Sequence, residues 1–319
     1  LEFTAEWYKN TSEDLLYAVP VPEQAGVSNT TVTMNAASMN NSGFEFAATY
    51  RNRDHDFKYE VSANLSTVRN RVTSLGFGTD SYISGAYITN VGEEIGKFYG
   101  WVYDGIARTQ ADLDNHATQE GAQIGDCLYK DVNNDGKVDS EDQVVLGSGM
   151  PKINFGLNAR FEYKRFDLSI ATFGALNYHV SDDVYNSLNS CYGWGNKEVG
   201  MLEANRFSED GSTYLSNVPR TYVTNSASLG WNDLFSSRKI QNAAYWKIAN
   251  VELGYNFPDK WFGKYVSDVR FYVSAQNLHT FTGYHGYNVD YAGGTFTPGY
   301  NFCSYPTART FMCGVHFTF

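Results

Sequence analysis

The residue pattern in this sequence best suited to chemistry is an acidic loop at positions 131–142, DVNNDGKVDSED. Oxygen-bearing side chains stand at loop positions 1, 3, 5, 9 and 12, with Gly136 at position 6 and an aliphatic residue at position 8, as in EF-hand-type calcium loops. Alternate side chains of such a loop converge on one ion, and the glycine permits the sharp turn. The pattern predicts calcium, or another hard cation, as a cofactor. The predicted ligands are Asp131, Asn133, Asp135, the main-chain carbonyl of Lys137, Asp139 and Asp142.

Two features of this loop depart from the calcium-binding pattern. Asp142 occupies the last position, where a bidentate glutamate is usual, and no amphipathic helix flanks the loop. The alternative is a turn rich in Asp and Asn, stabilised by bonds from its own side chains to its backbone. The residues alone leave both interpretations open.

Aromatic residues in the long polar connections are the second set of candidates. Exposed aromatic rings stack on sugar rings or pack against peptide side chains, so we predict substrate contacts for this set. The alternative is that these rings fill space inside loops that line a wide barrel. The predicted substrate-binding residues are Tyr192, Trp194, Trp231, Tyr284 and Tyr287.

The sequence carries no signature of an enzyme. It contains no GxSxG, HExxH, Walker or GxGxxG motif, and its six histidines are scattered. Its four cysteines show neither CxxC pairing nor zinc-ligand spacing, which leaves disulfides or buried free thiols as alternatives. We therefore predict a protein that is not an enzyme.

The elements that must position these candidates are strands, because apolar and polar residues alternate with a period of two. In 153–164 every odd position is apolar, from Ile153 to Tyr163, and every even position is polar or Gly. Similar alternation occurs at 1–8, 44–51, 57–66, 166–175, 245–257, 269–278 and 309–319, and more weakly at 15–21 and 98–107.

The lengths of these segments favour a membrane barrel over a soluble sandwich. Many of the roughly ten predicted strands reach the ~9–11 residues that cross a bilayer at a tilt. Short connections alternate with long ones near 70–97, 109–152, 177–243 and 281–308, as in outer-membrane barrels. The last predicted strand also ends on Phe319 itself, an apolar residue. We predict an all-β, antiparallel transmembrane barrel with long extracellular loops.

Composition agrees with this fold class. Aromatic residues make up 16% of the 319 residues and charged residues 18%, and no run approaches the ~20 apolar residues of a membrane-spanning helix. The formal net charge of −11 argues against nucleic acid as a partner, since phosphate binding needs a basic surface.

The chain resembles the C-terminal region of the SusC/RagA-type TonB-dependent outer-membrane transporters of Bacteroidetes. The resemblance runs in order over nearly the whole length. It rests on segments such as DLLYAVPVP, NNSGFEFAATYRN, GKFYGWVYDGI, GDCLYKDVNNDGKVDSEDQVVLGSGMPKINFGLNARFEYKRFDLSI and YWKIANVELGYNFP.

This resemblance implies properties that the alternation does not. Members close a barrel of about 22 strands around an N-terminal plug. They draw energy through TonB, pair with a SusD-like surface lipoprotein that lids the barrel, and import oligosaccharides or peptides. Residues 1–319 would then be the C-terminal half of the barrel in the cell outer membrane, in contact with lipid. The plug domain and early strands would lie on the remaining N-terminal polypeptide.

The predicted function is thus part of the active import of a bulky nutrient. Charged residues of the polar strand faces would line the lumen: Glu2, Arg51, Glu60, Arg160, Glu162, Glu252 and Arg270. One alternative is a surface binding or adhesion protein that does not transport and has a calcium-stabilised loop. Another is a secreted β-rich carbohydrate enzyme.

Overall fold

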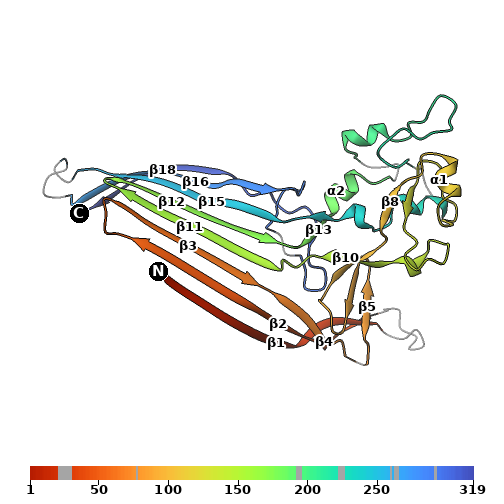
Figure 1. The fold of residues 1–319 in the computed structure, drawn as a ribbon, viewed down its shortest axis with the longest axis horizontal. Coiled ribbons are helices and arrows are strands. Elements are labelled where there is room, and N and C mark those ends of the chain that lie inside the picture. The colour runs from red at the N-terminus through yellow and green to blue at the C-terminus, as the bar shows by residue number, and fades with distance from the viewer. Residues whose placement is uncertain are drawn as a thin grey trace.

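A computed structural model describes residues 1–20, 31–76, 78–191, 196–221, 227–258, 261, 266–290 and 293–319. Long strands lie side by side at one end of the molecule, and the connections between them gather into a loop body at the other (Figure 1). Both termini lie at the strand end (Figure 1). Among the described residues, no helix is long and apolar enough to cross a membrane.

The long strands are those that the alternation predicts, and shorter elements make up the loop body. The strands are β1 (Glu2–Pro20), β2 (Thr31–Asn52), β3 (Phe57–Thr67), β4 (Arg69–Ser74), β5 (Ser81–Ser84), β6 (Tyr87–Asn90), β7 (Lys97–Gly100), β8 (Tyr103–Ile106), β9 (Cys127–Tyr129), β10 (Val144–Ser148), β11 (Ile153–Tyr163), β12 (Phe166–Leu176), β13 (His179–Asp182), β14 (Gln241–Asn242), β15 (Tyr245–Asn256), β16 (Asp268–Thr282), β17 (Tyr300–Asn301) and β18 (Thr310–Thr318). The helices are α1 (Gln110–Asp114), α2 (Asp183–Leu188) and the 3-10 turns η2 (Ser140–Asp142), η3 (Val199–Glu203), η4 (Ala227–Asp233) and η5 (Ser237–Lys239).

The long strands form one nine-stranded antiparallel sheet in the order β1-β2-β3-β11-β12-β15-β16-β18, with β4 also pairing β2. A tight turn joins β11 to β12, where Tyr163 pairs with Phe166 and Lys164 takes φ 55°. The connections β3 to β11, β12 to β15 and β16 to β18 all leave from the opposite end of the strands and enter the loop body.

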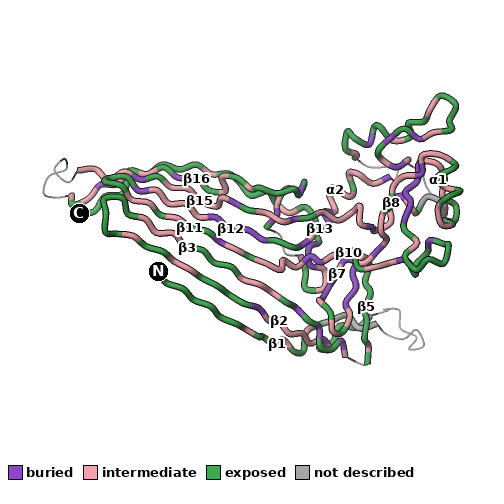
Figure 2. Tube along the Cα trace, viewed as in Figure 1, coloured by how far each residue is buried: buried purple, intermediate pink, exposed green. Residues whose placement is uncertain are grey.

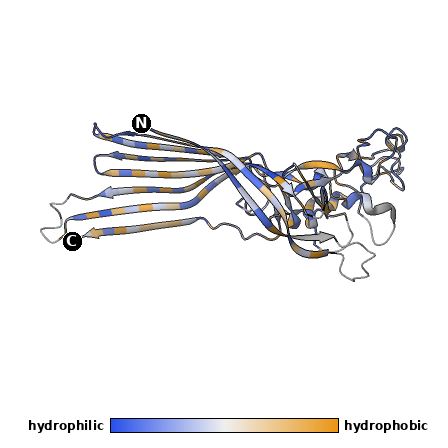
Figure 3. Cartoon of the chain, turned by 90° about the horizontal axis from the view of Figure 1, so that it is seen from below, coloured by the Kyte–Doolittle hydropathy of each residue, from blue (hydrophilic) through white to orange (hydrophobic). Residues whose placement is uncertain are grey.

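The register gives the sheet two chemically different faces. On one face, Phe161 pairs with Tyr59 on one side and with Leu168 on the other. On the opposite face, Arg160 pairs with Glu60 and Ser169. Orange and blue segments alternate along each strand accordingly (Figure 3).

The apolar face is not covered by other parts of the described chain. Phe57 is 47% exposed, Phe166 53% and Phe317 50%, although each lies in a regular strand. An exposed apolar surface of this extent marks contact with a membrane or a partner. The sheet therefore does not enclose a conventional core beneath it.

The buried core lies instead where the connections pack together (Figure 2). Three clusters form it, one around Leu75 and Ile95, one around Tyr178 and Tyr284, and one around Tyr129. The predicted long loops thus fold into a body with its own hydrophobic interior.

Two weakly alternating segments differ from the expected strands. Segment 98–107 forms the short strands β7 and β8 in the loop body, outside the nine-stranded sheet, and residues 15–20 continue β1. Residue 21 lies outside the described residues. The sheet has nine strands in the described part of the chain, in agreement with the roughly ten predicted. The long connections contain short strands and helices of their own.

The four cysteines are free thiols. Cys127 and Cys191 are buried, which matches the buried-thiol alternative, whereas Cys303 and Cys313 are exposed. Burial raises the pKa of Cys127 to about 12 and that of Cys191 to about 11, so both thiols stay protonated at neutral pH.

Candidate functional site

The polar face of the nine-stranded sheet carries rows of charged side chains. Pairing places Arg51 opposite Glu60, and Glu60 opposite Arg160, so that charges of opposite sign alternate from strand to strand. The set predicted to face the lumen shares this face. Its members are Glu2, Arg51, Glu60, Arg160, Glu162, Glu252 and Arg270.

Arg270 is the centre of the best-formed charge cluster on this face. Its Nε lies 3.0 Å from Oδ1 of Asp167, and a terminal nitrogen lies 2.8 Å from Oε1 of Glu252. The three side chains are 24%, 12% and 27% exposed. Gly254 makes room for them, because a Cβ there would lie 2.4 Å from the guanidinium and 2.5 Å from Asp167. The cluster ties β12, β15 and β16 together.

A second ion pair connects the sheet to the loop body. Lys247 of β15 has a side chain only 6% exposed, and its Nζ lies 2.5 Å from Oδ2 of Asp290. The same Nζ lies 5.7 Å from the ring centroid of Phe173. Asp290 belongs to the connection after β16, so this pair fixes that connection against the polar face of the sheet.

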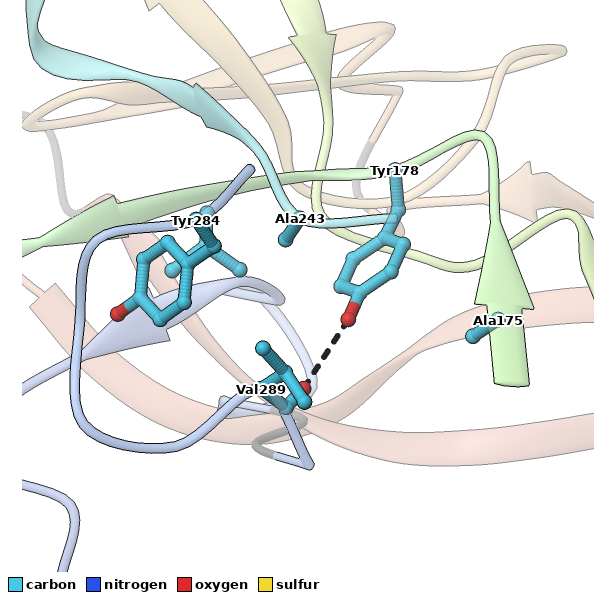
Figure 4. Packing of buried hydrophobic residues seen from close by; sticks show 6 residues of the cluster. Ala175, Tyr178, Ala243, Tyr284 and Val289 are labelled. Atoms are coloured by element: carbon cyan, nitrogen blue, oxygen red, sulfur yellow. Dashed lines mark hydrogen bonds between the residues drawn. The ribbon is translucent and has the colours of Figure 1, made fainter. Parts of the chain in front are cut away.

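A hydrophobic cluster holds the same connection in place (Figure 4). Tyr178 donates a hydrogen bond of 3.0 Å from its hydroxyl to the carbonyl of Val289. Tyr284, a predicted substrate contact, belongs to this cluster and is 5% exposed. Its hydroxyl donates to the buried carboxylate of Asp182 and accepts a hydrogen bond of 2.7 Å from Asn301.

The expectation that the ring of Tyr284 is exposed is therefore wrong, because the ring is buried. The connections pack into their own core, and the ring fills that core in place of facing a ligand. Burial, and then the hydrogen bond to Asp182, raise the pKa of Tyr284, so that its hydroxyl stays protonated and keeps donating.

The acidic loop is held together by its own side chains. Oδ2 of Asp131 accepts a hydrogen bond of 2.8 Å from the amide of Gly136. Oδ1 of Asn133 accepts one of 3.0 Å from Asp135, and Oδ1 of Asp135 accepts one of 2.9 Å from Lys137. These contacts match the turn stabilised by Asp and Asn side chains that the sequence left as an alternative.

Asp142 closes the loop from inside. Its side chain is fully buried, with Oδ1 2.7 Å from the amide of Val132 and Oδ2 2.9 Å from the amide of Asp139. Burial opposes the charge, but hydrogen bonds from Asp139, Val132 and Asn133 outweigh it and lower the pKa of Asp142. A lowered folded-state pKa stabilises the loop above the ordinary carboxyl range, and this stabilisation is lost as the pH falls through the lowered value.

The predicted calcium ligands only partly suit an ion in this arrangement. The carboxylates of Asp131 and Asp142 accept bonds from the backbone, and the described part of the chain holds no group of three or more His, Cys, Asp or Glu placed to share a metal. Calcium binding by Asp131, Asn133, Asp135, Lys137, Asp139 and Asp142 stays a prediction.

Two substitutions separate the turn from the calcium site. Asp142→Ala should disorder residues 131–142 with or without calcium, because it removes the buried carboxylate that pairs the amides of Val132 and Asp139, at a cost of about 1–3 kcal/mol. Asp135→Ala should disorder the loop only if the wild-type loop is held together by a bound ion. Hydrogen exchange of the loop, with calcium or with a chelator, measures both effects. Exchange that calcium does not slow in the wild type would exclude the ion.

Trp231, another predicted contact, lines an open hollow in the loop body. The hollow has a volume of about 580 Å³. Trp101 lines it as well, and Asp139 and Ser140 of the acidic loop form part of its wall. Two features that the sequence suggested separately, the acidic loop and an aromatic loop residue, thus meet at one place.

The other predicted substrate contacts lie elsewhere. Tyr287 is 67% exposed in the connection after β16. Tyr192 and Trp194 fall outside the described residues. The substrate role of these three residues stays a prediction.

Sequence reasoning did not single out Asp167, Lys247, Asp290 or Trp101. Asp167 occupies a position in its predicted strand that points to the polar face, so alternation carried a signal for it. Strict alternation from Glu252 would put Lys247 on the apolar face, and the register shift between Ile248 and Asn250 brings it to the polar face. Asp290 and Trp101 lie in segments without strong periodicity. Their roles depend on contacts made only after folding.

Known proteins resemble the chain over its full length. The TonB-dependent receptor P3 of Formosa agariphila is 30% identical over 338 residues, which cover 100% of this chain and 32% of that protein. The TonB-dependent receptor SusC of Bacteroides thetaiotaomicron is 25% identical over 98% of this chain and 29% of its own length. No family model matches the chain.

Solved structures agree on the fold. The RagAB peptide transporter superposes with a TM-score of 0.76 and 21% identity, over 98% of this chain and 33% of that one. The chain spans about a third of the length of the relatives it matches. It belongs to the SusC/RagA-type TonB-dependent receptors, and its large sheet is a portion of their β-barrel.

Proposed function

We propose that this chain is the C-terminal barrel portion of an outer-membrane importer for a bulky nutrient, an oligosaccharide or a peptide. The observation that carries the proposal is the two-faced sheet. Its exposed apolar side chains suit lipid, and its rows of charges suit an aqueous lumen. The full-length match to receptors of this type supports the same interpretation.

The open edges of the sheet imply further strands. Among the described residues, β1 pairs only with β2, and β18 pairs only with β16. Unpaired strand edges cannot stay exposed to lipid, because their backbone groups would lack hydrogen-bond partners. We infer that the remaining polypeptide supplies the strands that close the barrel, together with a plug.

The proposed partners follow from the same relatives. TonB would act through the plug, and a SusD-like surface lipoprotein would cover the loop body. RagAB is described as a peptide transporter, whereas the sequence of this chain leaves oligosaccharide and peptide both open. The loop body would face outward, opposite the tight β11–β12 turn.

Uptake by cells tests the proposal. A strain without the gene should lose the capacity to take up one class of labelled oligosaccharide or peptide, and the gene returned in trans should restore it. An uncoupler of the proton-motive force should abolish the restored uptake. Unchanged uptake of every nutrient class in the deletion strain would overturn the proposal.

A surface binding or adhesion protein is the second candidate, favoured by the solvent-open hollow beside Trp101 and Trp231. Under that alternative, the extracted protein would bind a ligand, and the deletion strain would lose attachment while keeping its uptake. Cell fractionation tests whether the protein is a membrane barrel at all. Recovery of a soluble, monodisperse protein without detergent would exclude any barrel.

A further inference from the structure

We propose that Trp101, which precedes β8, and Trp231 of η4 form a binding site for an uncharged saccharide ring in the loop body. The inference rests on the proposed import function, since import explains why a saccharide site would face outward. It goes further in naming the ligand chemistry and a second tryptophan.

Both indole rings are fixed by hydrogen bonds to the loop that faces them. Nε1 of Trp101 donates to the carbonyl of Asp139 at 2.9 Å, and Nε1 of Trp231 donates to the carbonyl of Glu120 at 2.9 Å. With these donors engaged, the rings offer the hollow mainly their apolar surfaces. Fixed aromatic surfaces bind without first losing side-chain freedom.

A buried tyrosine sets the separation of the two tryptophans. The ring of Tyr129 is 1% exposed, and its centroid lies 6.5 Å from that of Trp101 and 6.2 Å from that of Trp231. Its hydroxyl donates to the main-chain carbonyl of Trp231. Tyr129 therefore acts as a rigid spacer between the two tryptophans that line the hollow.

The rim of the hollow supplies hydrogen-bond acceptors. Glu120, Asp139 and Ser140 line it together with Gly121, Gly230 and Leu234, and no Lys or Arg is among the described residues that do so. Vicinal hydroxyls of a sugar can donate to the carboxylate of Glu120 and to that of Asp139, one oxygen of which already accepts from the amide of Glu141, while the C–H face of the ring rests on an indole. The volume of about 580 Å³ falls within the ~300–1,000 Å³ usual for small-ligand sites.

The same rim argues against other ligand classes. Two rim carboxylates, with no Lys or Arg among the described lining residues, disfavour sulfated, phosphorylated or uronic sugars. A peptide backbone presents a carbonyl acceptor for every amide donor. Among the described lining side chains only the Ser140 hydroxyl can donate to such carbonyls, since both indole N–H groups are engaged. A neutral saccharide carries no charge that the carboxylates would repel, and its hydroxyls can donate to the acceptors of the rim.

Binding to a printed array tests the inference, with the detergent-extracted protein as probe. The array would hold neutral oligosaccharides of glucose, mannose, galactose and xylose, sulfated and sialylated glycans, and synthetic peptides. We expect binding to neutral oligosaccharides only. Trp101→Ala and Trp231→Ala should each weaken that binding about tenfold, the equivalent of one aromatic contact.

Further variants separate binding from folding. Trp231→Phe keeps most of the packing on Tyr129, and Glu120→Gln keeps the fold while weakening the rim as an acceptor, so both should weaken binding with unchanged thermal unfolding. Trp261→Ala, at a tryptophan 67% exposed and outside the hollow, should bind like the wild type. Binding that both Trp101→Ala and Trp231→Ala retain in full would overturn the site, as would a preference for peptides or for charged glycans. A wild type that binds no saccharide yet still restores nutrient uptake would overturn the site and leave the importer standing.

Discussion

Replacing Arg270 by Met should lower the free energy of unfolding by about 2–4 kcal/mol, a loss reduced from that of a fully buried pair by partial exposure. Asp167 and Glu252 would then face each other without a cation between them. The urea midpoint of the detergent-solubilised protein, or the temperature at which its electrophoretic mobility shifts, measures the effect.

Two companion variants make this expectation specific. Arg160→Met is the matched control, since Arg160 and Glu162 are 64% and 41% exposed on the same face, and its cost should stay below about 1 kcal/mol. Replacing both carboxylates by amides in the Arg270→Met background should recover part of the loss, because no charge is then left unpaired. Equal costs at Arg270 and Arg160 would contradict this account of the cluster.

Asp290→Asn should release the connection after β16 more completely than Lys247→Met does. The asymmetry follows from burial, since Lys247 is 6% exposed and Asp290 27%. Loss of the carboxylate leaves an ammonium in a nearly dry site, whereas loss of the ammonium leaves a carboxylate that water can reach. Hydrogen exchange across residues 283–290 should rise by about two orders of magnitude for Asp290→Asn, the equivalent of about 2.7 kcal/mol.

The control for this pair is Asp104→Asn, whose partner Lys130 is 3.8 Å away and 56% exposed. That substitution should leave exchange in the 283–290 segment unchanged. The double variant Lys247→Met with Asp290→Asn should recover part of the protection. Greater exchange in Lys247→Met than in Asp290→Asn would reverse the expected order and show that the pair does not fix the connection.

The strands could be read from the sequence because two solvents act on them. Each residue of 153–164 faces either an apolar or a polar phase, so apolar and polar residue types alternate along the segment. The charges of the polar face, such as Arg160 and Arg270, follow from the same alternation. The partners they choose do not, since Gly254 decides how closely Asp167 approaches Arg270.

The loop body could not be predicted in this way. Lys247 and Asp290 are 43 residues apart, and Tyr129 meets Trp231 across 102 residues, so only the folded arrangement shows these contacts. Tyr284 illustrates the resulting error, because an aromatic residue in a polar segment suggested exposure while neighbouring connections bury it. The hydrogen bonds of the acidic loop match the turn held by its own side chains, and calcium binding at the same residues stays a prediction.

Lipid accessibility along β11 tests the central claim most directly. Single cysteines would be placed at successive positions from 156 to 161, after Ser replaces the exposed thiols Cys303 and Cys313, and labelled with an environment-sensitive dye in membranes containing brominated lipid. We expect quenching at Leu157, Ala159 and Phe161, and none at Gly156, Asn158 and Arg160, where the face is polar. Quenching without this alternation, or water-exposed dye at every position, would contradict the assignment of the sheet to a membrane barrel.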